Sequence, residues 1–136
     1  MNLAEALLAA DAGKIMKKQT KDLEIKRLSS RIGEPFILHL RELSPRRVND
    51  IAEMTTEVVD GKPKQNRYKM VLQVICEAVT DKDFDNRDVL KHYGVATRKE
   101  LFEKLFSVAE IEDIYTEANK LCGYGKEDET AAEIKN

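Results

Sequence analysis

Hydrophobic positions along the chain recur mostly every three or four residues, which is the spacing of one face of an α-helix. The first such stretch begins at Leu3 and can end at Gly13. A later one begins at Ser44-Pro45, where serine can cap a helix and proline fits its first turn. It should end before the Asp60-Gly61-Lys62-Pro63 sequence, which cannot continue helical hydrogen bonding. The pattern therefore predicts a largely helical chain.

The segment from about Gln65 to Val79 has the broadest apolar face in the sequence. Apolar side chains recur along it at spacings of three and four, and Val74 broadens the stripe further. A helix with such a wide apolar arc can contact neighbours on two sides, so we expect it at the centre of the core. Its apolar positions are Tyr68, Val71, Leu72, Ile75, Cys76 and Val79.

Three further helices are predicted between Asp85 and Gly123. Asp85 can cap a short helix that ends at Gly94. Thr97–Glu100 and Ser107–Glu110 both have the capping-box sequence, in which the hydroxyl accepts from an amide and the carboxylate reaches back to the cap. The helix that begins at Ser107 should end at Gly123, which permits a left-handed stop.

Between Lys21 and Leu40 the hydrophobic pattern alternates instead, with turn residues at Ser29, Ser30 and Gly33. This pattern predicts a β-hairpin with strands over Lys21–Leu28 and Pro35–Leu40, although the second segment could also be one buried extended arm. An isolated hairpin is marginal in water, so its apolar face should lie on the helices. We therefore expect a mainly α protein, a compact bundle of about five to six short helices with a small N-terminal β-hairpin packed on it.

The composition fits a single soluble domain. A chain of 136 residues can bury roughly two-thirds of its unfolded surface. Lys plus Arg number 23 and Asp plus Glu 25, so the net charge of −2 gives no long-range field for nucleic acid or an acidic membrane. We expect one domain over residues 1–124 and a polar, disordered tail over 125–136. The N-terminal stretch contains Glu5 and lacks the pattern of a signal peptide or membrane span, so we expect a cytoplasmic protein.

No set of residues suits catalysis, cofactor binding or metal binding. His39 and His92 have no second ligand or nucleophile at a functional spacing, so surface or structural roles are expected. The aspartates of Asp81–Asp88 resemble the start of a calcium loop, but glycine is missing at its sixth position and glutamate at its twelfth. Cys76 and Cys122 lie on apolar helix faces outside any CxxC pair, which is typical of buried thiols. We therefore expect a protein that is not an enzyme.

The helix after Thr97 has more apolar surface than one neighbour requires. Burial on both sides within the same domain explains most such arcs. The alternative is an exposed surface that receives a partner helix, with about 25 cal/mol gained per Å² of apolar area buried. The candidate partner-binding residues are Leu101, Phe102, Leu105 and Phe106, with Leu3, Leu7 and Leu8 of the first helix as a second surface.

Nucleic-acid binding is the other interpretation, because the sequence from Val89 to Phe106 has the helix, glycine turn and helix of a helix-turn-helix motif. The second helix offers Arg98, Lys99 and Lys104 to phosphates. Two glutamates on the same helix and the aspartates just before the motif would oppose that contact. A helix-turn-helix DNA-binding regulator is therefore the alternative function.

Several segments, in this order, resemble the XkdN-like phage tail assembly chaperones. The segments are LAEALLAA, EIKRLSSRIGEPFILHLRELSPRRVNDI, VLQVICEAV, DKDFDNRDVLKHYGV and TRKELFEKLFSVAEIEDIYTEANKLCGY. The most specific pieces are the turn Tyr93-Gly94-Val95, the ELFEKLF helix, the Ala109-Glu110-Ile111 start and the closing Leu121-Cys122-Gly123-Tyr124.

The resemblance implies a non-enzymatic protein of a tailed phage or prophage. Such a protein would bind the tape measure protein, keep it soluble, and help tail tube subunits polymerise around it. It would act in the cytoplasm of the bacterial host and be absent from the mature virion. Self-association is a further expectation for the partners, whereas nucleic acid and membrane are not expected.

Overall fold

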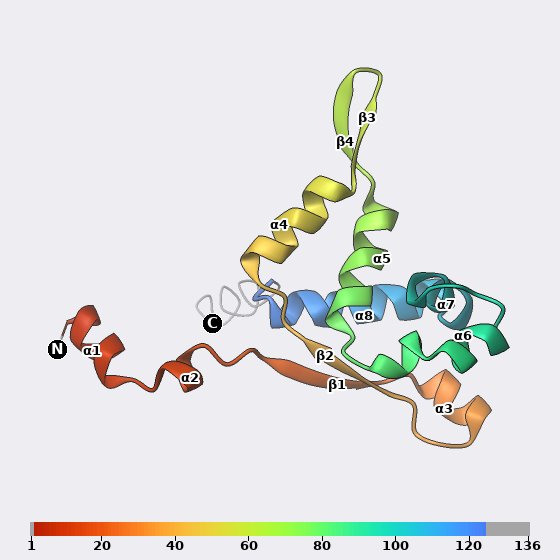
Figure 1. Ribbon diagram of the computed structural model, residues 1–136, viewed down its shortest axis with the longest axis horizontal. Helices are drawn as coiled ribbons and strands as arrows, with labels where there is room; N and C mark the ends of the chain where they lie inside the picture. The colour runs from red at the N-terminus through yellow and green to blue at the C-terminus, as the bar shows by residue number, and fades with distance from the viewer. Residues whose placement is uncertain (1, 125–136) are drawn as a thin grey trace, which may run out of the picture.

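Two helices that cross at the centre organise the fold, α5 (Arg67–Ala78) and α8 (Val108–Leu121) (Figure 1). The computed structural model describes residues 2–124. Six residues of α5 are buried, and they lie on more than one side of the helix. The prediction of a central helix after Gln65 is therefore confirmed.

The N-terminal hairpin is present, but a helix connects its strands. β1 (Thr20–Glu24) pairs antiparallel with β2 (Ile37–Arg41), with Glu24 opposite Ile37. Leu38 and Leu40 of β2 face the core, as the alternating pattern predicted.

The strand predicted over Lys21–Leu28 is wrong beyond Glu24, because the chain turns into α3 (Lys26–Ile32). Ile25 and Leu28, three residues apart, are both buried, which fits one turn of helix better than alternation along a strand. Gly33 ends α3 with φ of 88°. The Ser29 hydroxyl accepts a hydrogen bond from the Phe36 amide at 2.8 Å, which closes the loop into β2.

A second hairpin follows α4 (Pro45–Met54) and was not predicted. Ser44 caps α4 as expected, and Thr55 follows its last residue as the C-cap. β3 (Thr56–Val59) and β4 (Lys62–Gln65) then pair across Asp60 and Gly61, whose φ values of 53° and 75° match a type I′ turn. This Asp-Gly pair was predicted only to stop the preceding helix, although the same pair is also a strong signal for a hairpin turn. The hairpin projects beyond the helices (Figure 1).

The C-terminal half contains the expected short helices. The 3-10 helix η1 (Lys82–Asp85) precedes α6 (Arg87–His92) and α7 (Arg98–Leu105). Asn86 caps α6, where Asp85 was predicted. Ser107 and Glu110 form a complete capping box at the start of α8. At α7 the box is incomplete, because the Glu100 carboxylate accepts from the Ala96 amide rather than from the cap.

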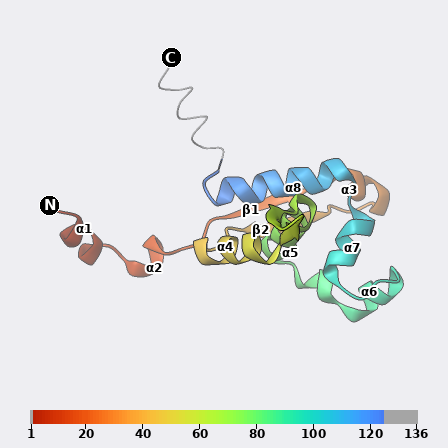
Figure 2. The ribbon, with the colours of Figure 1, turned by 90° about the horizontal axis from the view of Figure 1, so that it is seen from above.

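α1 (Leu3–Ala9) and α2 (Ala12–Ile15) form an arm that extends away from the rest of the molecule (Figures 1 and 2). Neither helix has a buried residue. Within residues 2–124 the chain thus has eight α-helices and two hairpins, more of each than the sequence analysis predicted. The tail predicted over 125–136 lies outside the described residues.

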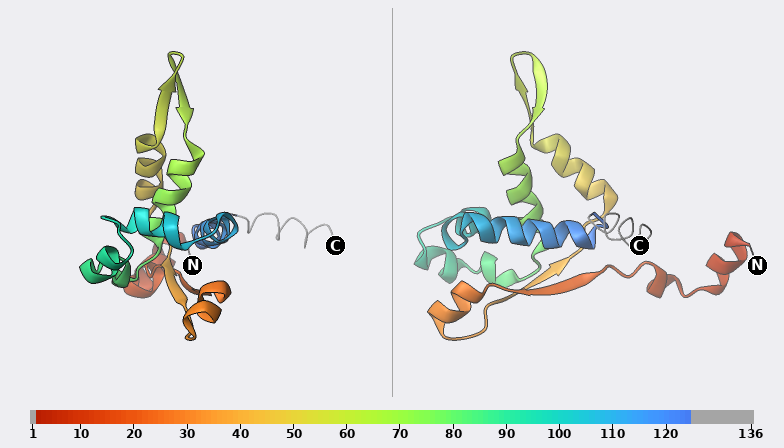
Figure 3. Two further views of the ribbon diagram at one scale, coloured as in Figure 1. Left: turned by 90° about the vertical axis from the view of Figure 1, so that its right-hand side faces the viewer. Right: turned by 180° about the vertical axis from the view of Figure 1, so that it is seen from behind.

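The core lies where α5 and α8 meet the first hairpin on one side and α4 on the other. The larger cluster joins β2 and α3 to α5, α7 and α8, and includes Leu38, Ile75, Phe102 and Ile114. A smaller cluster joins α4 to α5 and α8 around Ile51. Seen from behind, α8 crosses in front of α5, and the first hairpin lies below it in the view (Figure 3).

Candidate partner-binding surfaces

Three of the four apolar residues of the helix after Thr97 lie inside the protein. Leu101 and Phe102 are 0 % exposed and Phe106 is 5 % exposed, while Leu105 is partly buried. The Phe102 ring lies edge-on to Phe84 and to Phe106, with centroids 5.0 and 5.1 Å away. These residues hold α7 onto the core, which is the first of the two interpretations offered by the sequence. No exposed apolar ridge is left on this helix for a partner.

The leucines of α1 have the opposite environment. Leu3, Leu7 and Leu8 are 83 %, 65 % and 87 % exposed. Asn2 caps the helix, accepting from the Glu5 amide at 2.8 Å, so its start is fixed locally. An apolar helix surface of this kind is stabilised when a partner covers it.

The arm leaves the body beside an apolar groove, which we call the arm-side groove. Two adjoining hollows of about 440 and 300 Å³ form it, between α4 and the end of α8. Glu42 lines the groove, and its backbone and carboxylate hydrogen-bond the backbone of Gln19 at the base of the arm. Both hollows share the lining residues Leu43, Val48, Ala52, Cys122 and Tyr124.

This groove could not be predicted from the sequence, because its walls come from segments about 70 residues apart. The one feature of the local sequence that hints at the groove is Tyr124, which lines it. This aromatic residue follows the glycine that ends α8 and has no place in the helical stripe.

A second groove, which we call the far groove, lies at the opposite end of the molecule from the arm. It has a volume of about 290 Å³ and lies between the loop before β2 and the elements η1, α6 and α7. Its apolar walls include Phe36, Ile37, Val89 and Tyr93, and Asp81 and Asp83 add two carboxylates. The far groove is therefore apolar inside and acidic at its edge.

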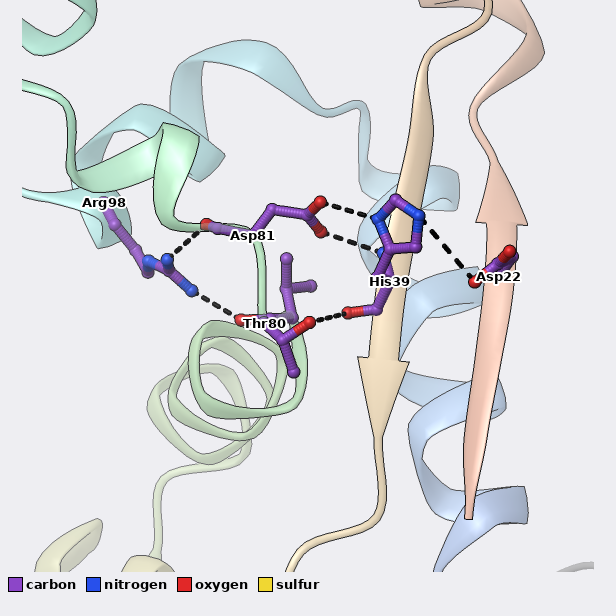
Figure 4. A network of polar contacts seen from close by, with 6 residues as sticks. Asp22, His39, Thr80, Asp81 and Arg98 are labelled. Atoms are coloured by element: carbon purple, nitrogen blue, oxygen red, sulfur yellow. Dashed lines mark hydrogen bonds and ion pairs between the residues drawn. The ribbon is translucent and has the colours of Figure 1, made fainter. Parts of the chain in front are cut away.

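A polar network joins β2 to the end of α5 (Figure 4). The Asp81 carboxylate accepts from the His39 amide at 2.8 Å and lies 2.7 Å from the His39 Nδ1. This hydrogen bond and the Asp81 charge raise the pKa of His39, with smaller contributions from Asp22 and Asp83. The Thr80 amide and hydroxyl both donate to the His39 carbonyl. His39 thus has a structural role, as its sequence environment predicted.

Arg98 completes the network from the α7 side. Its guanidinium donates to the carbonyl oxygens of Cys76, Val79 and Asp81 and to the Asp85 carboxylate, at 2.6 to 3.1 Å. The side chain is only 14 % exposed. Arg98 was the first cation proposed for phosphate contact in the helix-turn-helix interpretation. Its guanidinium is instead committed to the carbonyls at the end of α5.

Arg27 of α3 makes a comparable contact with the start of α8. It donates to both carboxylate oxygens of Glu110, at 2.6 and 2.9 Å, and to the Leu105 carbonyl. The bonds from Arg27 and from the Ser107 amide lower the pKa of Glu110 to about 2. Because α3 connects the two strands of the first hairpin, these bonds fix that hairpin to α8. They therefore help to position the arm-side groove and the far groove, which lie on either side of this contact.

The described residues provide little reactive chemistry. Burial raises the pKa of the Cys76 thiol to about 12, which disfavours its thiolate. Among residues 2–124, no group of three His, Cys, Asp or Glu side chains is placed to hold a metal ion. In the same part of the chain, no helix is both long and apolar enough to cross a membrane.

The sequence was compared with models of protein families and with curated proteins. The sequence model of one family, the phage XkdN-like tail assembly chaperone proteins, matches residues 4–135. No curated protein is similar enough to the chain to match it.

A solved structure shares the fold. The crystal structure of the protein YqbN superposes with a TM-score of 0.59 over 85 % of this chain and 98 % of that one, at 14 % sequence identity. At this identity the likeness concerns the fold alone.

Proposed function

Because this chain belongs to the family of phage XkdN-like tail assembly chaperones, we propose that it binds the tape measure protein and supports assembly of the tail tube around it. The role is non-enzymatic. The protein acts in the cytoplasm of the bacterial host, keeps the long tape measure chain soluble, and leaves before the virion is complete.

One observation carries this proposal: the leucines of α1 are uncovered, and the arm that carries them leaves the body beside the arm-side groove. Amphipathic helices bind by laying their apolar face into grooves of this kind. When the arm folds back over a client helix seated in the arm-side groove, Leu3, Leu7 and Leu8 would cover the outer side of that helix. The arm and the groove together would then shield a helix that is insoluble alone.

The surface charge suits a protein that must release its client. Charged residues make up 35 % of the chain and include both signs in nearly equal number. Such a surface keeps the free chaperone soluble while its apolar patches remain small. Binding then depends on local apolar contact, which later assembly steps can replace.

The test is co-expression of the tape measure protein with the chaperone, followed by measurement of the soluble tape measure fraction. Replacing Leu3, Leu7 and Leu8 together by Asp should lower that fraction several-fold, because these three leucines would become buried against the client and contribute most of the arm's contact. The matched control is Ala9→Asp, about 200° around α1 from Leu7. It adds a carboxylate to the same exposed helix and should leave the soluble fraction unchanged.

Two results would reject the proposal. One is an equal soluble fraction with the leucine variant and with the unaltered protein. The other is recovery of the protein from purified virions at the copy number of a tail component. A shift of duplex DNA that weakens steeply with salt would instead favour the regulator interpretation.

A further inference from the structure

We infer that the far groove binds an amphipathic helix of a protein partner, and that lysine or arginine side chains border the apolar face of that helix. The inference goes beyond the proposed function, because it concerns a second surface and stands whether or not the arm-side groove holds the tape measure protein. Three properties of the far groove identify the partner: its apolar rim, the occupied backbone edge of β2 beside it, and its charge.

The apolar surface of the far groove continues outward over its rim. Phe84 is buried in the wall, whereas Ile32, Ile37 and Tyr93 are 57 %, 42 % and 44 % exposed. A small ligand held inside the hollow of about 290 Å³ would leave these three side chains in water. A polypeptide that lies across the hollow would cover them and gain the free energy of their burial. The apolar pattern therefore favours a protein partner.

The backbone edge of β2 beside the groove is already occupied, which excludes a partner strand there. A partner strand would add to β2 through free amides and carbonyls on that edge. The His39 amide donates to the Asp81 carboxylate, and the His39 carbonyl accepts from the Thr80 amide and hydroxyl. Leu40 forms a bridge with Val79 one residue further along. A helix satisfies its own backbone and brings only side chains to the groove, so it needs no free edge.

The charge of the far groove selects a basic partner. Asp81 and Asp83 line the groove, and no lysine or arginine is among the described residues that line it. The Asp81 carboxylate is bonded to His39. Asp83 and Asp88, the second of which is next to the lining residue Val89, have no ion-pair partner within residues 2–124. These two exposed carboxylates are therefore available to cations of a partner.

The cations of the chain nearest to the groove do not neutralise it. Lys104 donates to the Tyr93 carbonyl at 3.3 Å, and Lys82 lines a separate hollow on the other side of η1. Three more cations are close in the sequence but do not line the groove, namely Arg31, Arg87 and Lys91. Ion pairs at an exposed edge add little affinity, but they decide which sign of charge a partner can carry. Lysines or arginines on the borders of an apolar helix face match this edge.

Two synthetic peptides, each labelled with fluorescein, test the inference. Both are helices of about 18 residues with leucines at helical spacing, and the leucine stripe is bordered by lysines in one and by glutamates in the other. Fluorescence anisotropy with the full chain should show the lysine peptide binding roughly tenfold more tightly than the glutamate peptide, and added salt should reduce the difference.

A charge-reversed variant places the contact in the far groove. Asp83→Lys with Asp88→Lys should reverse the preference, so that the glutamate peptide binds more tightly than the lysine peptide. A gain of binding cannot result from unfolding, and circular dichroism melts check the fold as well. The matched control is Glu53→Lys with Asp113→Lys, which makes the same change of charge at exposed positions of α4 and α8. It should keep the preference of the unaltered protein.

The variant with Leu3, Leu7 and Leu8 replaced by Asp separates this inference from the proposed function. It should bind the lysine peptide as the unaltered protein does, even where it no longer supports the tape measure protein. The inference is overturned if the unaltered protein binds neither peptide up to 1 mM, or binds both equally. It is also overturned if the folded groove variant keeps the original preference, which would leave the hollow to a small apolar molecule. Loss of self-association in the groove variant with unchanged peptide binding would assign the groove to a second copy and reject the inference too.

Discussion

Arg98 is the residue at which the most inter-element polar contacts converge. Its guanidinium binds three carbonyls and one carboxylate, and it lies 5.9 and 5.8 Å from the ring centroids of Phe84 and Phe102. The carbonyls at a helix end are otherwise satisfied by water or a cap. At the end of α5 Arg98 takes over this role from a distance of about 20 residues in the sequence.

We expect Arg98→Ala to destabilise the protein by about 3 kcal/mol, because it leaves partly buried carbonyls and the two rings without their cation. The free energy of unfolding in urea measures the effect. Lys99→Ala is the matched control, since it removes the neighbouring exposed cation and should cost no more than about 0.5 kcal/mol. Equal losses for the two variants would contradict the role assigned to Arg98.

His39 makes stability depend on pH near neutrality. Its pKa is raised above the ordinary 6.5 by the hydrogen bond that the ring donates to Asp81, by the Asp81 charge, and by the charges of Asp22 and Asp83. The pKa of His39 is higher in the folded state than in the unfolded state. The stabilisation that protonated His39 contributes is therefore fully present below about pH 6.5, and it is lost as the pH rises through the raised pKa.

We therefore expect the urea concentration at the unfolding midpoint to decrease as the pH is raised from 5.5 to 8.5. His39→Gln should flatten this dependence on pH. The carboxylates whose pKa is lowered are already ionised across that interval, so they do not contribute to it. His92→Gln serves as the control and should keep the slope of the unaltered protein. A slope that survives His39→Gln would assign the pH dependence elsewhere.

Among the elements of the body, which begins after the arm, the second hairpin depends least on the rest of the fold. Every residue from Val58 to Gln65 is exposed. The buried contact at its base is made by Thr55, whose hydroxyl accepts from the Gln65 side chain at 2.6 Å. The hairpin is thus held by its own pairing and by the helices at its base.

We expect that replacing residues 57–64 with a two-glycine linker changes the free energy of unfolding by no more than about 1 kcal/mol. The change removes almost no buried apolar area, which is the main source of stability. Keeping Thr55 and Gln65 in the shortened chain preserves their hydrogen bond. A loss of several kcal/mol would show that the projection supports the core.

Some helices and strands could be predicted from the sequence, and others could not. α4, α5 and α8 were predictable because their caps and apolar spacing are local and agree with each other. α3 was missed because its short run has no side-chain cap, and the Asp60-Gly61 turn was read only as a stop. The arm-side groove and the bonds of Arg98 and His39 join residues far apart in the chain. Pattern analysis along the sequence cannot pair such residues.

At the scale of the whole molecule, the arm and the body are separable. The arm has no buried residue as far as Met16, whereas the body contains both core clusters. We expect a chain lacking residues 2–16 to unfold at the same urea midpoint, with the same denaturant dependence, as the full chain. The same truncation should remove the support of the tape measure protein. A lowered midpoint would mean that the arm packs on the body in solution.

The position of α8 has a consequence for synthesis. This helix is the last described element, yet it covers β1, β2 and α5. Translation proceeds from the N-terminus, so a nascent chain that has emerged only as far as Phe106 displays the apolar side of both partners to the cell. Native structure can form only after the final turn near Leu121 has cleared the ribosome exit. A ribosome stalled before that point would hold a polypeptide that itself needs protection from aggregation.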